Sequence, residues 1–496
     1  MGKYDQYKEK MEKIADVKYT LAVLQWDQET YLPPKGANFR GRQIATLSEL
    51  VHQLSTEENL GQLLHELEDD RSLSAREKKN VSLTLEDYDK QKKYSPGFVR
   101  RLSETVARSF HSWLAARKEN SFSLFQKDLG ELIELKKQEA EILGYKEHPY
   151  DALINEFEKG ATVSLLDKTF AGLLPSLKTL LGNIAEKKQV SDQFLQQYFP
   201  RQSQWDFGMY LIRKMGFDFE AGRQDISEHP FTVSFNKNDV RITTRINEND
   251  FGSMTWSCIH ETGHALYEQG LPESEYGLPG GEFASLSIHE SQSRLWENNV
   301  GRSFGFWKYH YPALQEFLPD QLRTIGLTDF YHGINKVESS CIRTEADEVT
   351  YHFHVMIRYE IEKLLIEGNL KVPEIPAYWN ERYANYLQVK VPDDKRGCLQ
   401  DIHWSHGSLG YFPTYSLGSF YAAQFFDTAT KQIPNLRQEI ESGDTSALLN
   451  WLRQQIHQFG RMFTSEELCT RTCGEPLNIQ YFMNYLIDKY RKIYQF

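Results

Sequence analysis

The sequence predicts a mainly α-helical protein with one small β element. Along most of the 496 residues, apolar side chains recur at spacings of three and four, which is the pattern of amphipathic helices. Clusters of proline and glycine separate these segments. No internal repeat and no low-complexity linker divides the chain. We therefore expect one large domain over residues 1–496, in which residues 1–80 could form a helical lid.

The individual elements can be placed along the chain. Helical patterns occupy residues 40–66, 99–144, 162–188, 346–367 and 477–493. The one strong strand pattern is FTVSFNKNDVRITTRI at 231–246, where two β-prone runs flank residues 236–239. Asn and Asp tolerate the dihedral angles of tight turns, so this stretch predicts a β-hairpin.

Composition and charge exclude several classes of protein. Apolar residues make up 40% and charged residues 25%, which is typical of a globular protein. No segment approaches the roughly 18 consecutive apolar residues of a membrane helix. The net charge of −12 argues against a nucleic-acid partner, because polyanion binders usually carry a basic excess. The N-terminal segment is charged and lacks the apolar run of a secretory signal, so we expect a cytoplasmic protein without a membrane partner.

The chemistry centres on His260-Glu261-Thr262-Gly263-His264. On a helix, two histidines four residues apart lie on one face, about 6 Å apart, and both imidazoles can reach one metal ion. Glu261 lies one position round the helix, where its carboxylate can take a proton from the attacking water. The flanking sequence supports a helix that Ser253 caps and Gly270 ends. The small Gly263 suggests close packing beside the site.

A catalytic zinc usually has three protein ligands. The extended motif with a third histidine on the same segment is excluded, because Tyr267 and Gly270 occupy the positions that it requires. The next helical pattern, residues 282–300, offers three acids: Glu282, Glu290 and Glu297. Glu282 could simply be a helix-dipole charge and Glu297 a surface acid. Glu290 is favoured because it lies mid-helix among small residues, although the spacing alone leaves the choice open.

At this point the sequence resembles the carboxypeptidase Taq family of metallopeptidases. The shared elements run in order along the chain: WDQET at 26–30, HPF at 229–231, DxRxT at 239–243, HExxH at 260–264, HESQ at 289–292, IRxxAD at 342–347 and GxxQDxHW at 397–404. The resemblance implies a nearly all-helical fold with a deep substrate groove, like that of angiotensin-converting enzyme and neurolysin. It also implies homodimers that remove single residues from peptide C-termini with broad specificity.

The resemblance also implies a site. One Zn²⁺ per subunit, for which Co²⁺ can substitute, would be held by His260, His264 and Glu290, with Glu261 as the general base. The loop at 403–415 would supply oxyanion donors, for which we favour Tyr411 and His406, while His403 and Tyr415 would contact substrate.

A free C-terminus also needs a cation to bind its carboxylate. Arg343 and Arg241 are the candidates, because each lies within a family motif and a guanidinium binds a carboxylate through two hydrogen bonds. Asp239 and Asp347 could orient an arginine or a ligand histidine.

Two other functions remain open. The first is an endopeptidase or oligopeptidase of the same clan, which the HExxH motif does not distinguish from a carboxypeptidase. The second is a non-catalytic zinc-stabilised binding protein, which would be expected to lack the base; Glu261 argues against it.

Overall fold

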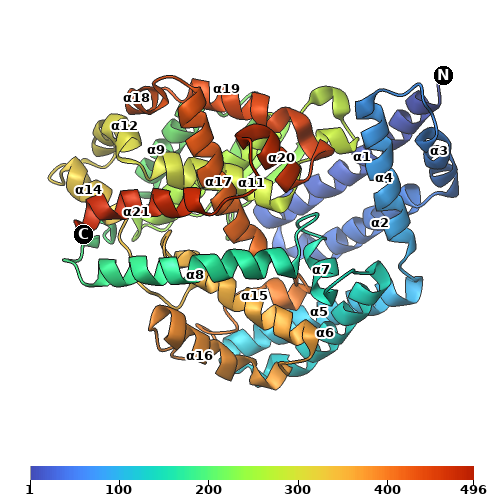
Figure 1. The fold of residues 1–496 in the computed structure, drawn as a ribbon, viewed down its shortest axis with the longest axis horizontal. Helices are drawn as coiled ribbons and strands as arrows, with labels where there is room; N and C mark the ends of the chain where they lie inside the picture. Colours follow the sequence, from blue (N-terminus) through green and yellow to red (C-terminus); the bar gives the residue numbers. More distant parts are fainter. Residues whose placement is uncertain (1) are drawn as a thin grey trace. The chain divides into compact units, whose positions relative to one another are not determined.

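A computed structural model describes residues 2–496, and helices make up most of it (Figure 1). The chain forms two compact units, each built from three segments. Unit 1 comprises Met1–Lys92, Ser191–Ile334 and Tyr421–Leu477, and unit 2 comprises Lys93–Val190, Asn335–Phe420 and Asn478–Phe496. The mainly helical fold class is confirmed. The expected single domain and the lid at 1–80 stay predictions.

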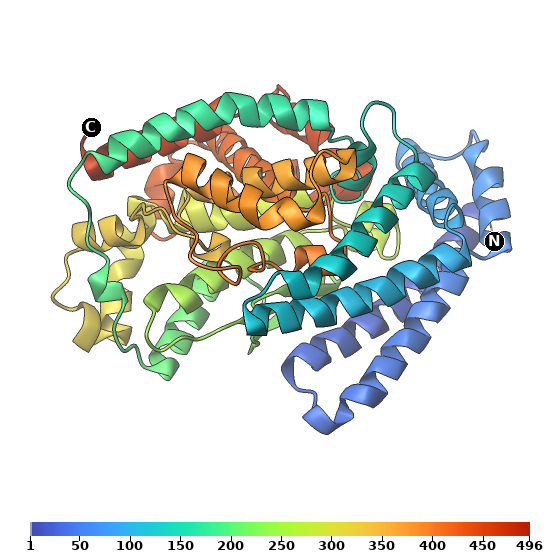
Figure 2. The same ribbon diagram turned by 90° about the horizontal axis from the view of Figure 1, so that it is seen from below.

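Unit 1 holds the sheet and most of the α-helices. Its α-helices are α1 (Lys3–Thr30), α2 (Ala37–Ser55), α3 (Glu58–Glu68), α4 (Ala75–Lys92), α9 (Arg201–Lys214), α10 (Phe251–Glu268), α11 (Leu286–Arg294), α12 (Phe304–Phe317), α13 (Pro319–Leu322), α14 (Leu327–Ile334), α18 (Leu436–Glu441), α19 (Ser446–Gln455) and α20 (Ser465–Cys473). The helical pattern at 40–66 is therefore divided between α2 and α3. Helices α1 and α2 pack as a hairpin, which is clear in Figure 2.

Unit 2 consists of helices that confirm most of the other predicted segments. They are α5 (Pro96–Glu119), α6 (Ser123–Leu143), α7 (Pro149–Ile154), α8 (Val163–Ala185), α15 (Tyr351–Glu367), α16 (Ile375–Leu387) and α21 (Gln480–Tyr494). Helix α17 (Phe412–Gln432) begins in unit 2 and continues into unit 1. The pattern at 99–144 corresponds to the packed pair α5 and α6, because a turn around residues 120–122 interrupts it.

The sheet of unit 1 has three strands in the order β1-β3-β2. Strands β2 (Thr232–Asn236) and β3 (Asp239–Thr244) pair antiparallel, so the hairpin prediction is confirmed. Strand β1 (Gly222–Ile226) pairs parallel with β3 and was not predicted, since its sequence GRQDI lacks an apolar alternation. Helix α10 packs on β2 and β3, which places the HExxH segment beside the sheet.

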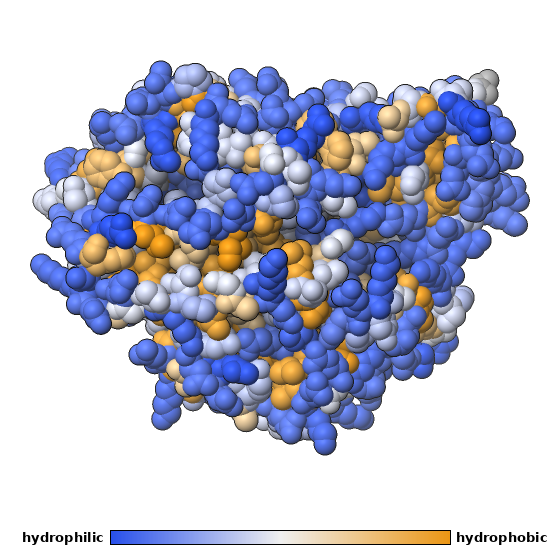
Figure 3. All heavy atoms as spheres, viewed as in Figure 1, coloured by the Kyte–Doolittle hydropathy of each residue, from blue (hydrophilic) through white to orange (hydrophobic). Residues whose placement is uncertain are grey.

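The core of unit 1 lies directly under α10. Ile259 and Leu266 of that helix are fully buried, as are Val240 and Ile242 of β3. Hydrophilic side chains cover most of the face drawn in Figure 3, with smaller apolar patches among them. Among residues 2–496, no helix combines the length and the apolar character needed to span a bilayer.

Candidate metal centre

Helix α10 brings the two histidines of the motif onto one face. It begins at Phe251, where the Asp250 carboxylate accepts a hydrogen bond from the amide of Gly252 at 2.9 Å. The expectation that Ser253 caps the helix was therefore wrong: an acid three residues earlier is the cap, and Ser253 lies in the first turn. From this start, His260 and His264 fall one turn apart, with ring centroids separated by 4.9 Å.

Gly263 allows α10 and α11 to touch through their backbones. A Cβ at this position would lie 2.6 Å from the Ser293 Cα and 2.8 Å from the Gln292 carbonyl oxygen. Real Cβ atoms do not approach backbone so closely, so any side chain here would separate the helices. The helical glycine weakens α10 by about 1 kcal/mol relative to alanine, but it brings the acid of α11 within reach of the two histidines.

We expect Gly263→Ala to destabilise unit 1 and to weaken metal binding. The added methyl group overpacks the contact between α10 and α11, at a cost of about 1–3 kcal/mol in the free energy of unfolding measured by urea denaturation. Gly130→Ala is the matched control, because Gly130 lies in α6 with open space around it. That variant should be more stable by about 1 kcal/mol. Wild-type stability and metal affinity in Gly263→Ala would contradict the close packing described here.

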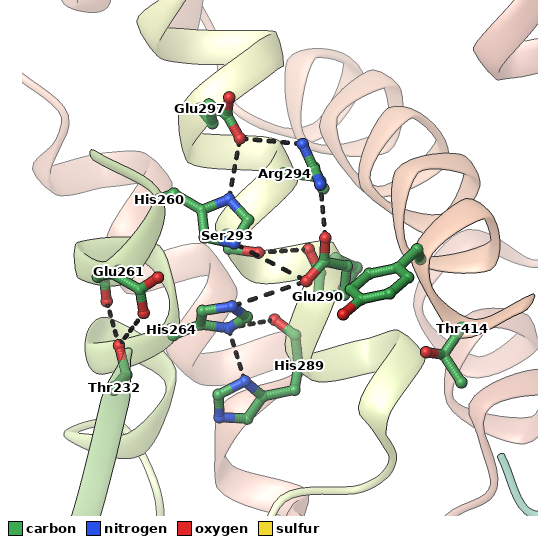
Figure 4. Close-up of polar contacts among 12 residues, drawn as sticks. Thr232, His260, Glu261, His264, His289, Glu290, Ser293, Arg294, Glu297 and Thr414 are labelled. Atoms are coloured by element: carbon green, nitrogen blue, oxygen red, sulfur yellow. Dashed lines mark hydrogen bonds and ion pairs between the residues drawn. The ribbon is translucent and has the colours of Figure 1, made fainter. Parts of the chain in front are cut away.

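Three donor atoms converge between these helices. The ligand-type atoms of His260, His264 and Glu290 lie within 4.8 Å of one another. Glu290 Oε2 is 3.8 Å from His260 Nε2 and 3.7 Å from His264 Nε2, and the three side chains point toward a common centre in Figure 4. Of the three acids that the sequence left open, Glu290 is the one that faces both histidines. Glu282 is paired instead with Lys18 and Arg461.

The remaining nitrogen of each imidazole has its own partner. His260 Nδ1 lies 2.8 Å from Glu297 Oε2, and His264 Nδ1 lies 3.0 Å from the carbonyl oxygen of His289. Ligating imidazoles normally hydrogen bond through the nitrogen that does not face the metal, which fixes the tautomer and the ring orientation. Burial also holds the pKa of His264 well below its ordinary value, so this ring is neutral and able to act as a ligand.

Glu290 and Glu297 are joined through Arg294. The Nε of Arg294 donates to Glu290 Oε1 at 2.7 Å, and its Nη1 donates to Glu297 Oε2 at 3.2 Å (Figure 4). Glu290 Oε1 is thus occupied, and Oε2 is the oxygen directed at the histidines. Although burial alone would raise the pKa of Glu297, Arg294 and the hydrogen bond from His260 lower it far below the ordinary value, so the side chain is a carboxylate.

Glu297 contacts a predicted ligand histidine, a position that the sequence does not indicate. It was interpreted as a possible surface acid on a regular helix, but it lies on a π-helical segment, Leu295–Gly301, and is buried. Such segments often occur at functional sites, yet their altered register is not visible in a sequence periodicity. The HExxH motif indicates such a residue indirectly, because a ligand histidine needs a hydrogen-bond partner for the ring nitrogen that does not face the metal.

We expect Glu297→Gln to weaken metal binding by about 10- to 100-fold, which is typical for loss of an outer partner of a ligand histidine. The amide can still accept from His260 Nδ1, but it removes the negative charge that favours the ligand. Isothermal titration with Zn²⁺ measures the effect. Glu273→Gln is a suitable control because this acid is exposed. An unchanged affinity in Glu297→Gln would show that Glu297 does not support the ligand.

The donor set fits a divalent cation of the zinc type. Zinc–nitrogen and zinc–oxygen distances of about 2.0–2.2 Å in a tetrahedron place neighbouring ligand atoms about 3.3 Å apart. The separations of 3.7 and 3.8 Å are close to this value. Two imidazoles and one carboxylate leave one position open, as catalytic sites require.

Glu261 lies beside this centre and is hydrogen bonded to the sheet. The Thr232 hydroxyl at the start of β2 is 2.6 Å from Glu261 Oε2 and 3.1 Å from the Glu261 carbonyl oxygen. Burial raises the pKa of Glu261 above its ordinary value, and the opposing effects of His260 and Thr232 do not cancel this. The hairpin therefore orients a carboxylate that is more basic than a surface glutamate.

Unit 2 brings several other predicted residues together. His403 Nε2 lies 3.1 Å from the Tyr415 hydroxyl, and the His403 ring is 5.3 Å from the ring of Tyr411. Burial lowers the pKa of His403 to about 3, so this imidazole is neutral. His406 ends the short 3₁₀ helix η8 (His403–His406) and packs against Phe110 at 5.2 Å. Their proposed contacts with substrate stay predictions.

Each of the two candidate arginines has an acidic partner. Arg343 is buried and donates from Nε and Nη2 to Asp401 Oδ1 at 3.0 and 2.9 Å, while its Nη1 donates to the Tyr351 hydroxyl. Arg241, on β3, binds both carboxylate oxygens of Asp239 at 2.9 Å and lies 4.3 Å from the Trp26 ring.

Asp239 and Asp347, the two acids expected to orient an arginine or a histidine, have different contacts. Asp239 does orient an arginine, as expected. Asp347 instead accepts the backbone amides of Val349 and Thr350, directly before α15, so its carboxylate orders the turn that leads into this helix rather than orienting a cation.

A mainly helical fold with two histidines and a glutamate around one point, and a second glutamate beside them, defines a metal-dependent hydrolase. Comparison with known families makes the class specific: the model of the carboxypeptidase Taq (M32) metallopeptidases matches residues 6–490. The chain belongs to this family and is a metallocarboxypeptidase. Membership implies a divalent metal and peptide substrates.

Individual relatives agree over the full length. Carboxypeptidase 1 of Bacillus subtilis (strain 168) is 36% identical, with 98% of this chain and 97% of the relative covered. The crystal structure of the M32 carboxypeptidase from Deinococcus radiodurans R1 matches with a TM-score of 0.98 at 36% identity, covering 100% of both chains. A solved structure described as "The Structure of CHT" is 58% identical, with a TM-score of 0.97 and 99% of each chain covered.

Proposed function

We propose that this protein is a zinc-dependent carboxypeptidase that removes single residues from the C-termini of peptides with broad specificity. The observation that carries the proposal is the cluster of His260, His264 and Glu290, with Glu261 beside it on the same helix. Two nitrogen donors and one carboxylate match zinc, and Co²⁺ prefers similar ligands. The named relatives are carboxypeptidases, which favours exopeptidase over endopeptidase activity.

Glu261 carries the proton in this proposal. When bound, the cation supplies Lewis-acid chemistry, in that it polarises the peptide carbonyl and makes water a stronger acid. The Glu261 carboxylate removes a proton from the attacking water and delivers it to the leaving amine. Burial raises the pKa of Glu261 above its ordinary value, which makes its carboxylate a stronger base, and Thr232 donates to Oε2 and orients the group.

The residues of unit 2 are proposed to bind and orient the substrate. Tyr411 and His406 would donate to the developing oxyanion, and His403 and Tyr415 would contact the peptide. Arg343 is proposed to bind the terminal carboxylate, with Arg241 as the second candidate. Arg343 already pairs with Asp401, so a substrate carboxylate would share or displace that partner.

The direction of cleavage is tested with two peptides that differ only at the C-terminus. Mass spectrometry of a free-ended peptide should show a ladder that shortens from the C-terminus and disappears with a chelator. The amidated peptide should be cut far more slowly. Equal rates on both peptides would support an endopeptidase and contradict the carboxypeptidase assignment.

We also propose that the enzyme acts as a cytoplasmic homodimer, as the family resemblance implies. Light scattering should then give twice the chain mass of 57.9 kDa. A mass equal to one chain would contradict the dimer, and the site of unit 1 would remain complete in that case.

A further inference from the structure

Glu362 is a buried carboxylate of unit 2 that the proposed chemistry does not use. It lies on α15 and has no exposed surface. Oε1 accepts a hydrogen bond from Trp404 Nε1 at 2.8 Å, and Oε2 accepts one from the amide of Gly410 at 2.8 Å. The hydroxyl of Tyr150, on α7, donates to Oε2 as well. Both carboxylate oxygens therefore have donors.

Two of these donors lie on either side of His406, and the second of them directly precedes Tyr411, the other proposed oxyanion donor. Trp404 precedes His406 by two residues, and Gly410 directly precedes Tyr411. Fixing the Gly410 amide fixes the peptide from which Tyr411 extends. The carboxylate thus holds the segment 404–410 at both ends.

The third donor ties the same carboxylate to α7, against which this segment is packed. Gly410 has a φ of +99°, and a Cβ there would lie 2.7 Å from the carbonyl oxygen of Leu153 on α7. Tyr150 of α7 donates to Glu362 from the same helix. The loop backbone is therefore held between α7 and the carboxylate of α15, and only glycine fits at this point.

Burial of an acidic side chain is energetically unfavourable compared with burial of an apolar one. Burial raises the pKa of Glu362 to about 7, and Arg358, the cation that opposes this, has its own Nε bonded to Asp401 at 2.6 Å. Burying a carboxylate without an adjacent counter-ion costs several kcal/mol unless hydrogen bonds compensate it. Here the compensating donors come from the loop and from α7, which indicates that the acid serves to order the loop.

We infer that Glu362 is a positioning residue that holds the loop 404–410 so that His406 and Tyr411 keep their working orientation. The inference rests on the proposed function for the role of those two residues. The hydrogen bonds from Trp404, Gly410 and Tyr150 to Glu362, called the clamp below, do not depend on the proposed function.

Glu362→Gln tests the clamp with little change in volume. The amide keeps one acceptor oxygen but places an NH₂ group against the donors at the other. Hydrogen–deuterium exchange of peptides covering residues 404–411 should become faster by about tenfold or more. The kcat for peptide hydrolysis should fall by about 10- to 100-fold, as expected for misplaced reacting groups, while KM and the metal content stay near wild type.

Glu139→Gln is the matched control. Glu139 is a buried acid of unit 2 on α6 that accepts the Tyr94 hydroxyl at 3.1 Å and pairs with Lys136, and its partners lie outside the loop. It should lose comparable thermal stability with wild-type kcat and exchange at 404–411. If Glu362 acts through Tyr411, the kcat losses of Glu362→Gln and Tyr411→Phe should combine less than additively on a free-energy scale.

The outcomes separate the inference from the proposed function. Unchanged exchange at 404–411 in Glu362→Gln, or a wild-type kcat, overturns the role of Glu362. Fully additive kcat losses with Tyr411→Phe also overturn it. A wild-type protein that hydrolyses no peptide would refute the proposed function instead, and the exchange measurement would still decide whether the clamp exists.

Discussion

Replacement of Glu261 by glutamine is expected to lower kcat by about 10²- to 10⁴-fold while the protein keeps its metal. The amide has nearly the same shape and can keep the contact with Thr232, but it cannot accept a proton from water. Steady-state hydrolysis of a free-ended peptide gives kcat, and metal analysis of the same preparation gives the occupancy. The two measurements together separate a lost base from a lost cofactor.

Glu282→Gln is the control for this substitution. Glu282 is a further acid of unit 1, but it pairs with Lys18 and Arg461 away from the ligand atoms. We expect this variant to keep wild-type kcat. If Glu261→Gln hydrolyses peptides at the wild-type rate, another group must accept the proton, and the assignment of Glu261 as the base is wrong.

Glu290→Gln should lose metal affinity by more than the 10- to 100-fold expected for an outer partner such as Glu297. The substitution removes the negative charge and leaves a single amide oxygen, which can face either the two histidines or Arg294 Nε, with an NH₂ group at the other position. Zinc should raise the melting temperature of the wild-type protein, because a ligand that binds only the folded state stabilises it by mass action. This stabilisation should vanish in Glu290→Gln at the same zinc concentration.

The same Glu282→Gln variant controls for the loss of an acid in this part of the chain. It should retain the full zinc-dependent rise in melting temperature. If Glu290→Gln binds zinc as tightly as the wild type, Glu290 is not the third ligand, and Glu297 becomes the acid to examine.

The sequence predicted the part of the site that depends on local spacing. The interval between His260 and His264 is a property of one helical turn, so their common face followed from the residue numbers. The hairpin at 231–246 was predictable for a similar reason, since strand alternation and turn residues are local. The third ligand was harder, because the spacing along the chain left three acids open, and only the packing of α10 on α11 places Glu290 opposite the histidines.

The features that could not be predicted depend on register changes and on distant partners. Glu297 reaches His260 from a π-helical segment, which a period of 3.6 residues does not describe. Strand β1 was missed because its pairing with β3, rather than its own composition, makes it a strand. That Arg343 binds a substrate carboxylate stays a prediction, and its pairing with Asp401 is a contact across 58 residues that no local pattern indicates.

The proposed activity depends on one divalent cation that His260, His264 and Glu290 hold jointly. Anomalous diffraction at the zinc edge, from crystals grown with zinc, tests this binding most directly. We expect a single strong peak about 2.0–2.2 Å from His260 Nε2, His264 Nε2 and Glu290 Oε2. A map without a peak at this position, with the Glu290 side chain turned away from the histidines, would contradict it.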